Sequence, residues 1–135
     1  MPACSDPGYS ISPCPGQRVA GPDDAVMAVG WAVDVGRTAT VFLLLDAGRH
    51  VTDVRVLGGL LATENLDRAI EVLRGRRESS IVVAAVSPGR PTLPSADERE
   101  AWRRLRWRCA DGGVRVLDCL IISGHRWRSL AETES

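Results

Sequence analysis

The side chains best suited to chemistry are scarce in this 135-residue chain. The main candidates for metal binding or nucleophilic catalysis are six residues: Cys4, Cys14, Cys109, Cys119, His50 and His125. They lack the paired short spacings of a zinc module. A serine or cysteine nucleophile needs a nearby base and an orienting group, and two histidines far from most serines supply little of either. Spacing alone therefore predicts neither a structural zinc site nor a catalytic triad.

A second group of candidates combines arginine with tryptophan. Residues 96–110 contain five arginines and two tryptophans, and residues 126–128 read Arg-Trp-Arg. Guanidinium and indole groups can pair with phosphates and stack on bases, which suits nucleic-acid binding. The arginines equally fit a solvated helix face, because Trp102, Leu105 and Cys109 have the spacing of a core-facing stripe. Both interpretations stay open for this candidate binding surface, which consists of Arg99, Arg103, Arg106, Trp107, Arg126 and Arg128.

The composition indicates one globular domain. Hydrophobic residues make up 44% of the chain, and no apolar run approaches the length of a membrane-spanning helix. The seventeen cationic residues, all arginine, balance seventeen acidic residues, so the whole chain has no positive field that would attract a polyanion. The first residues resemble no secretory signal, and we therefore expect a cytoplasmic protein with reduced thiols and no membrane contact.

Hydrophobic patterning and turn residues predict alternating helices and strands around a mixed sheet. The expected elements are a helix over 25–35, a hairpin of strands 41–45 and 54–56, a helix from Thr63 to about Gly75, a strand over 81–86, a helix from 95 to 110, and strands over 114–122 and 126–130. Residues 1–22 are rich in Pro, Gly and Ser, and we expect a flexible segment there. Residues 23–131 form the expected domain, and residues 132–135 form a tail.

Two carboxylates have structural interpretations. Ser95 and Glu98 have the spacing of a capping box, in which each side chain satisfies a backbone N–H at the start of a helix. Asp118 lies in an apolar strand, where an unpartnered carboxylate would be costly. We therefore expect Asp118 to accept hydrogen bonds from nearby backbone or from arginine.

The spacing of several of these residues resembles a known family. Pro88, the run Pro-Ser-Ala-Asp-Glu over 94–98, a helix, and the run Val-Leu-Asp-Cys-Leu-Ile-Ile-Ser-Gly over 116–124 follow one another in that order. They resemble the RadC-type branch of the JAB/MPN family, whose signature is His-Asn-His-Pro-Ser-Gly, Pro-Ser-x-x-Asp, a helix, and Leu-Leu-Asp-His-Ile-Ile-Ile-Gly. The resemblance covers about residues 25–130. It implies an α+β fold, an α/β sandwich of the cytidine-deaminase-like kind, with a mixed sheet flanked by helices.

The resemblance also implies zinc-dependent hydrolysis, but the residues that carry it in the family differ in this chain. The family hydrolyses peptide or isopeptide bonds with zinc held by two His and one Asp, and a Glu activates the bound water. The two His positions fall on Ala85 and Ser87, and the Asp position falls on Glu98, or on Asp97 if the loop slips by one. A methyl group or a neutral hydroxyl cannot replace imidazole on zinc. Residues 37–40, where the Glu is expected, contain no carboxylate.

A relocated metal site is the alternative that retains catalysis. The His of the family's Asp-His pair is Cys119 here, directly after Asp118. A rebuilt site would use Ser87, Glu98, Cys119 and His125, although His125 has the sequence context of an exposed loop residue.

Three hypotheses follow for function. The first is a catalytically inactive RadC-like JAB/MPN domain, without metal or cofactor, that binds or scaffolds another protein. The second is a diverged zinc hydrolase with the relocated ligands. The third is a nucleic-acid-binding accessory protein that uses the arginine and tryptophan side chains.

Overall fold

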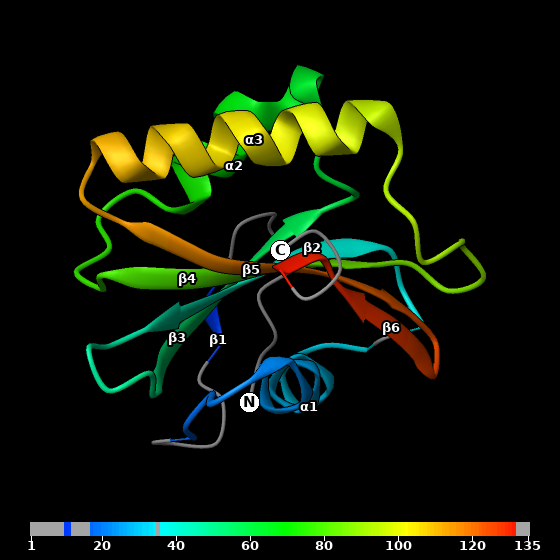
Figure 1. Cartoon of the computed structure of the whole chain (residues 1–135), viewed down its shortest axis with the longest axis horizontal. Helices are drawn as coiled ribbons and strands as arrows, with labels where there is room; N and C mark the ends of the chain where they lie inside the picture. Colours follow the sequence, from blue (N-terminus) through cyan, green and yellow to red (C-terminus); the bar gives the residue numbers. More distant parts are fainter. Residues whose placement is uncertain (1–9, 12–16, 35, 132–135) are drawn as a thin grey trace.

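The computed structural model describes residues 10–11, 17–34 and 36–131. Helices and strands are interspersed along the chain, as Figure 1 shows. In order they are β1 (Ser10–Ile11), α1 (Pro22–Ala32), β2 (Ala39–Leu45), β3 (Val51–Gly58), a 3-10 turn η1 (Thr63–Asn65), α2 (Leu66–Val72), β4 (Ser80–Val86), α3 (Ala96–Asp111), β5 (Arg115–Ser123) and β6 (Arg126–Ser129).

One mixed sheet forms the centre of the molecule. The strand order is β1-β3-β2-β4-β5-β6, and every neighbouring pair is antiparallel except the parallel pair β4 and β5. The two central strands, β2 and β4, are continuous apolar runs and are almost wholly buried. Such runs suit strands that are covered on both faces. The mixed sheet flanked by helices confirms the expected α+β fold.

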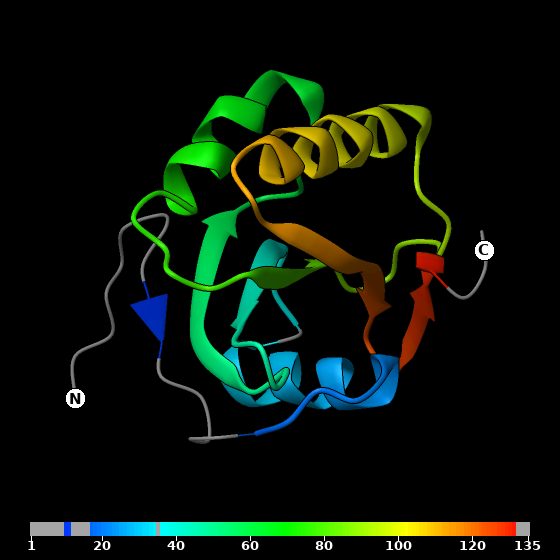
Figure 2. The same ribbon diagram turned by 60° about the vertical axis from the view of Figure 1, so that its left-hand side comes forward.

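The helices cover the two faces of the sheet separately. Figures 1 and 2 show α2 and α3 on one face and α1 on the other. Along β2, Phe42 and Leu44 pack towards α2 and α3, whereas Val41 and Leu43 pack with the core under α1. This alternation follows from the two-residue period of a strand. The sheet therefore separates two apolar cores, one under α2 and α3 and the other under α1.

Every helix and strand predicted from the sequence is present, with differences at their ends. The helix predicted from residue 25 begins earlier, at Pro22, with Gly21 as its N-cap. Thr63 was expected to cap the next helix, but Ala62 precedes a 3-10 turn there, and the Asn65 carboxamide accepts from the Ala62 N–H at 2.7 Å. Thr63 instead donates from its hydroxyl to Asp97 at 2.7 Å. This contact across 34 residues gives no signal in the local sequence.

The segments at the two ends were expected to lie outside the domain. Most of residues 1–22 and all of residues 132–135 lie outside the described residues, including Cys4 and Cys14. The described parts of the N-terminal segment contact the domain: β1 pairs with β3, Arg18 forms a bridge with His50, and Val19 is buried in the core under α1. Among the described residues, no helix is both long and apolar enough to cross a membrane.

Candidate functional site

The end of β4 places Ala85 and Ser87 at the edge of the core. Ala85 is fully buried on the side of α2 and α3. Its neighbour Ser87 follows the strand, and the Ser87 N–H donates to the Ile122 carbonyl at 3.0 Å. The Ser87 hydroxyl lies 3.1 Å from the hydroxyl of Thr38, which precedes β2. Two neutral hydroxyls therefore meet at this end of the sheet.

A buried ion pair anchors the loop between β4 and α3. The Arg90 guanidinium donates to both carboxylate oxygens of Glu98, at 2.7 and 2.6 Å. Both side chains are largely buried, with exposed fractions of 12% for Arg90 and 8% for Glu98. The pair has the two-pronged geometry that makes arginine–carboxylate contacts strong.

Glu98 also forms the predicted capping box. Its carboxylate accepts from the Ser95 N–H at 3.0 Å, and the Ser95 hydroxyl accepts from the Glu98 N–H at 3.1 Å. The structural interpretation of Glu98 is confirmed. With Arg90 on both oxygens and Ser95 on one of them, the carboxylate is already occupied.

Asp118 ties β5 to the end of the chain. It accepts from the Cys119 N–H at 2.7 Å, the Ser129 hydroxyl at 2.5 Å and the Ala131 N–H at 3.1 Å. The expectation of backbone donors is confirmed. The third donor is the Ser129 hydroxyl, and not an arginine as the alternative expectation had it. These donors satisfy a buried carboxylate, as its burial requires.

The structure separates the residues of the hypothetical relocated site. Cys119 pairs with Val83, four residues before Ser87 on β4, and its side chain is buried in the core under α2 and α3. His125 lies in the exposed turn between β5 and β6. In the part of the chain that the structure describes, no three His, Cys, Asp or Glu side chains gather closely enough to hold a metal ion. Ser87, Glu98, Cys119 and His125 therefore form no common site.

Three arginines from the candidate binding surface line a cleft between α3 and β5, called here the arginine cleft. Its arginines, Arg99, Arg103 and Arg106, follow one another at helical spacing on one side of α3. Trp102, Val116, Leu117, Leu130 and Ala131 complete the lining. The volume is about 550 Å³, which is within the usual range for ligand pockets.

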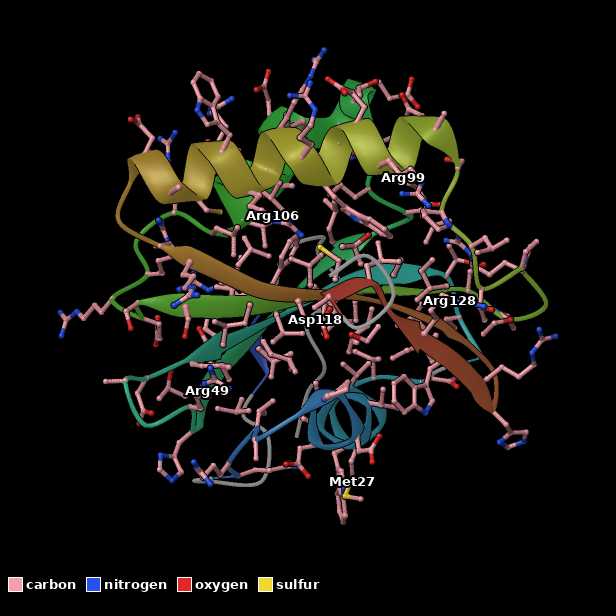
Figure 3. The ribbon with its side chains drawn as sticks, viewed as in Figure 1. Met27, Arg49, Arg99, Arg106, Asp118 and Arg128 are labelled. Carbon is pink, nitrogen blue, oxygen red and sulfur yellow. The ribbon has the colours of Figure 1, made fainter. Side chains whose placement is uncertain are left out.

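The arginines of the cleft differ in their partners. Arg103 shares Glu100 with Arg104, and hydrogen bonds from these two guanidinium groups lower the pKa of the Glu100 carboxyl. Arg106 instead lies near the Cys119 sulfur, at 3.9 Å, and no carboxylate of the described residues forms an ion pair with it. Figure 3 shows Arg106 extending from α3 towards the sheet. Arg106 is thus the cleft's least neutralised cation.

The remaining members of the candidate binding surface lie elsewhere. Trp107 is 75% exposed and lines a groove on the outer side of α2 and α3. Arg126 and Arg128 lie on β6, where Arg128 is the partner of Ile121, and neither lines the arginine cleft. Trp127, between them, is 36% exposed because β6 is the edge strand of the sheet.

Comparison with protein families gives one decisive match. A model of the RadC-like JAB domain matches residues 34–135, which is most of the chain and nearly all of the sheet. The chain belongs to the RadC-like JAB domain family. Among curated proteins, no match is found.

The metal implied by the family does not fit the residues of this RadC-like JAB domain. By the resemblance described above, the zinc ligands fall on Ala85, Ser87 and Glu98, or on Asp97 if the loop slips by one, and Asp97 already accepts two hydrogen bonds from Thr63. Ala85 offers no donor atom, and the Ser87 hydroxyl is hydrogen-bonded to Thr38. The Glu98 oxygens are held by Arg90, whose positive charge also opposes a cation there. We therefore derive no catalytic step through a metal at this end of the sheet.

Sequence reasoning missed two features of this RadC-like JAB domain. One is Arg90, whose pairing with Glu98 depends on how the proline-rich loop folds back. The other is the arginine cleft as a unit, because its walls come from α3, β5 and the residues after β6. The helical spacing of Arg99, Arg103 and Arg106 was a usable signal for one wall.

Proposed function

We propose that this RadC-like JAB domain is a binding module that does not hydrolyse peptide or isopeptide bonds. The observation that supports the proposal is the pairing of Arg90 with Glu98. It places a cation on Glu98, the carboxylate on which the Asp ligand of the family falls unless the loop slips by one to Asp97. With Ala85 and Ser87 at the two histidine positions, this end of the sheet offers structural contacts in place of ligands.

The described residues also offer no alternative nucleophile at this position. Serine becomes reactive when a neighbouring base accepts its proton. The described hydrogen-bond partner of the Ser87 hydroxyl is the Thr38 hydroxyl, which is a poor base. The residue thus fits a role in joining β2 and β4 at their ends.

The partner in this proposal is another protein, and the compartment is the cytoplasm. The thiols of Cys109 and Cys119 are buried, as suits a reducing environment. A fold that keeps its core and loses its ligands retains surfaces that a partner can bind.

Metal content is the direct test of the proposal. The chain is purified without a histidine tag, and zinc is measured by elemental analysis, with thermal unfolding recorded with and without a chelator. We expect far less than one zinc per chain and an unchanged melting temperature. A Glu98→Gln variant is measured in parallel, because a zinc ion bound through Glu98 would be lost from it.

Two outcomes would contradict the proposal. One is stoichiometric zinc in the natural chain that disappears in Glu98→Gln. The other is metal-dependent cleavage of a model isopeptide substrate that the chelator abolishes. Either result would favour a zinc-dependent hydrolase over a binding module without hydrolytic activity.

A further inference from the structure

The arginine cleft presents cations around an apolar floor. Among the described residues, its lining contains Arg99, Arg103 and Arg106 and no carboxylate side chain. The other described lining residues are apolar or indole side chains. A ligand that matches this lining has negative charges next to apolar groups. We propose that the arginine cleft binds an acidic, extended peptide segment of a partner protein.

Arg106 provides the clearest charge for such a segment. Its described contact is the weak acceptor Cys119 Sγ at 3.9 Å, so its guanidinium donors remain available for a carboxylate. Arg103 already shares Glu100 and adds a partly neutralised charge beside it. A carboxylate of the peptide would therefore pair first with Arg106.

Trp102 gives a second, independent indication of an acceptor. This residue lines the cleft and is only 3% exposed. Its indole nitrogen Nε1 is buried and has no described hydrogen-bond partner. A buried donor without an acceptor costs free energy, and a carboxylate or carbonyl oxygen of a bound peptide would supply one.

The edge of the sheet favours an extended occupant. β6 pairs with β5 only from Leu120 onward, so no described strand covers that side of residues 115–119. Figure 2 shows β6 beside the last part of β5 only. A free strand edge offers backbone groups to an added peptide strand. The bulge at Leu117 shortens this ladder, and side-chain contacts must provide much of the binding.

The path of the peptide continues onto the other face of the sheet. A smaller hollow of about 200 Å³ shares Leu117 and Ala131 with the cleft and is also lined by Arg49 and Asp118. Figure 3 shows Arg106 and Arg49 on opposite sides of the sheet, with Asp118 at its level. Asp118 keeps its negative charge there, because its three hydrogen-bond donors are neutral, and Arg49 brings a positive charge to the same hollow. With one charge of each sign, the hollow suits an uncharged part of the peptide, and the carboxylates of the peptide pair in the arginine cleft.

A peptide fits these features better than a nucleic acid does. Base stacking needs an exposed aromatic face, but the aromatic side chain described in the cleft, Trp102, is buried. The exposed Trp107 lies in the outer groove, which Arg103 and Arg106 also line, and not in the cleft. The chain as a whole has no net positive charge to attract a phosphate backbone. Carboxylates alternating with apolar side chains match the cleft in both charge and lining.

Fluorescence anisotropy with a labelled peptide of alternating Glu and Leu tests the proposal. We expect saturable binding to the natural chain that becomes about tenfold weaker in Arg106→Gln, as the loss of one charge-assisted hydrogen bond predicts. Arg104→Gln is the matched control, because Arg104 lies on the same helix and shares Glu100 but does not line the cleft. That variant should change the affinity less than twofold.

Two further controls refine the measurement. A peptide with Gln in place of Glu should not bind, since it has no carboxylates. Glu132 and Glu134 directly follow Ala131 in the sequence, so an E132Q/E134Q chain is measured beside the natural one to remove competition from its own carboxylates. The Trp102 indole N–H signal in an NMR spectrum is assigned by elimination with W31F, W107F and W127F, and it should move on binding.

The inference rests on the proposed function, because it names the class of partner that the binding module takes. Separate experiments can nevertheless contradict the inference and the proposed function. Metal content tests the residues around Glu98, whereas peptide binding tests the cleft. The inference is wrong if the acidic peptide does not bind at millimolar concentration, or if Arg106→Gln and Arg104→Gln weaken it equally. It is also wrong if a labelled single-stranded oligonucleotide binds more tightly and depends on Arg106.

Discussion

The guanidinium of Arg90 contacts both carboxylate oxygens of Glu98, eight residues away, at 2.7 and 2.6 Å. The contact closes the proline-rich loop onto the first turn of α3. It therefore joins two roles in one carboxylate, because Glu98 caps the helix and also fixes the loop. This explains why a buried Glu is stable at this position.

Removal of the Glu98 charge should destabilise the fold strongly. Glu98→Gln leaves the largely buried Arg90 without its counter-charge, and we expect a loss of about 2–4 kcal/mol in the free energy of unfolding. Urea unfolding measures it. Glu71→Gln is the control, because its exposed pair with Arg74 should contribute less than about 0.5 kcal/mol. Equal losses in the two variants would show that the buried pair has no special importance.

Asp118 should also be hard to replace. Asp118→Asn keeps an oxygen for the two backbone N–H donors, but it loses the charge and makes the Ser129 hydroxyl reverse its role and accept from the new NH₂ group, so we expect a loss of about 1–2 kcal/mol. Ser129→Ala removes a single donor and should cost about 1 kcal/mol. Urea unfolding distinguishes the two, with the exposed Asp111→Asn as a control. A neutral Asp118→Asn would mean that the C-terminal end of the domain is not held through this carboxylate.

Local sequence signals were sufficient for most of the fold. The apolar runs of β2 and β4 marked buried strands, and the Ser95–Glu98 capping box placed the start of α3. These signals work because each depends on residues within one turn or one strand. The order of the motifs then indicated the family, and the family match confirms it.

The arrangement of the candidate site could not be predicted in the same way, because it depends on contacts between residues far apart in the sequence. Thr63 looked like a helix cap, but its hydroxyl has a better partner in Asp97, across 34 residues. Cys119 and His125 are six residues apart in sequence, yet one is in the core and the other in an exposed turn. The arginine cleft likewise needs the packing of α3 against β5 before its walls exist.

The thiol of Cys109 should be unreactive in the folded protein. Burial raises the pKa of this thiol, so little of the reactive thiolate is present near neutral pH. We expect alkylation of Cys109 to be at least about tenfold slower than in the unfolded chain, measured by pulsed labelling and peptide mapping. Rapid labelling of Cys109 in native protein would contradict its burial under α3.

The same shift predicts a pH dependence at the alkaline end. Because the folded pKa of Cys109 lies above the ordinary thiol value of 9.0, only the unfolded chain ionises there at first. Its contribution to stability is therefore present below about pH 9 and is lost as the pH rises towards the folded value. A Cys109→Ala variant should lack this component of the alkaline loss of stability.

Glu100 should show the opposite dependence, at acidic pH. Hydrogen bonds from Arg103 and Arg104 lower the pKa of its carboxyl below the ordinary value of 4.5. The stabilisation it provides is therefore complete above that value and disappears as the pH falls through the folded pKa. We expect Glu100→Gln to be less stable than the natural chain at pH 7 and equally stable once Glu100 is protonated.

An NMR titration of the Glu100 side chain tests this prediction directly. Arg103→Gln should raise the pKa, since Arg103 provides the largest contribution, and Arg104→Gln should raise it less. High salt should shrink both effects because the three side chains are exposed enough to be screened. If neither substitution changed the pKa of Glu100, Glu100 would not bridge the two arginines. Arg103 would then present its full charge to the cleft.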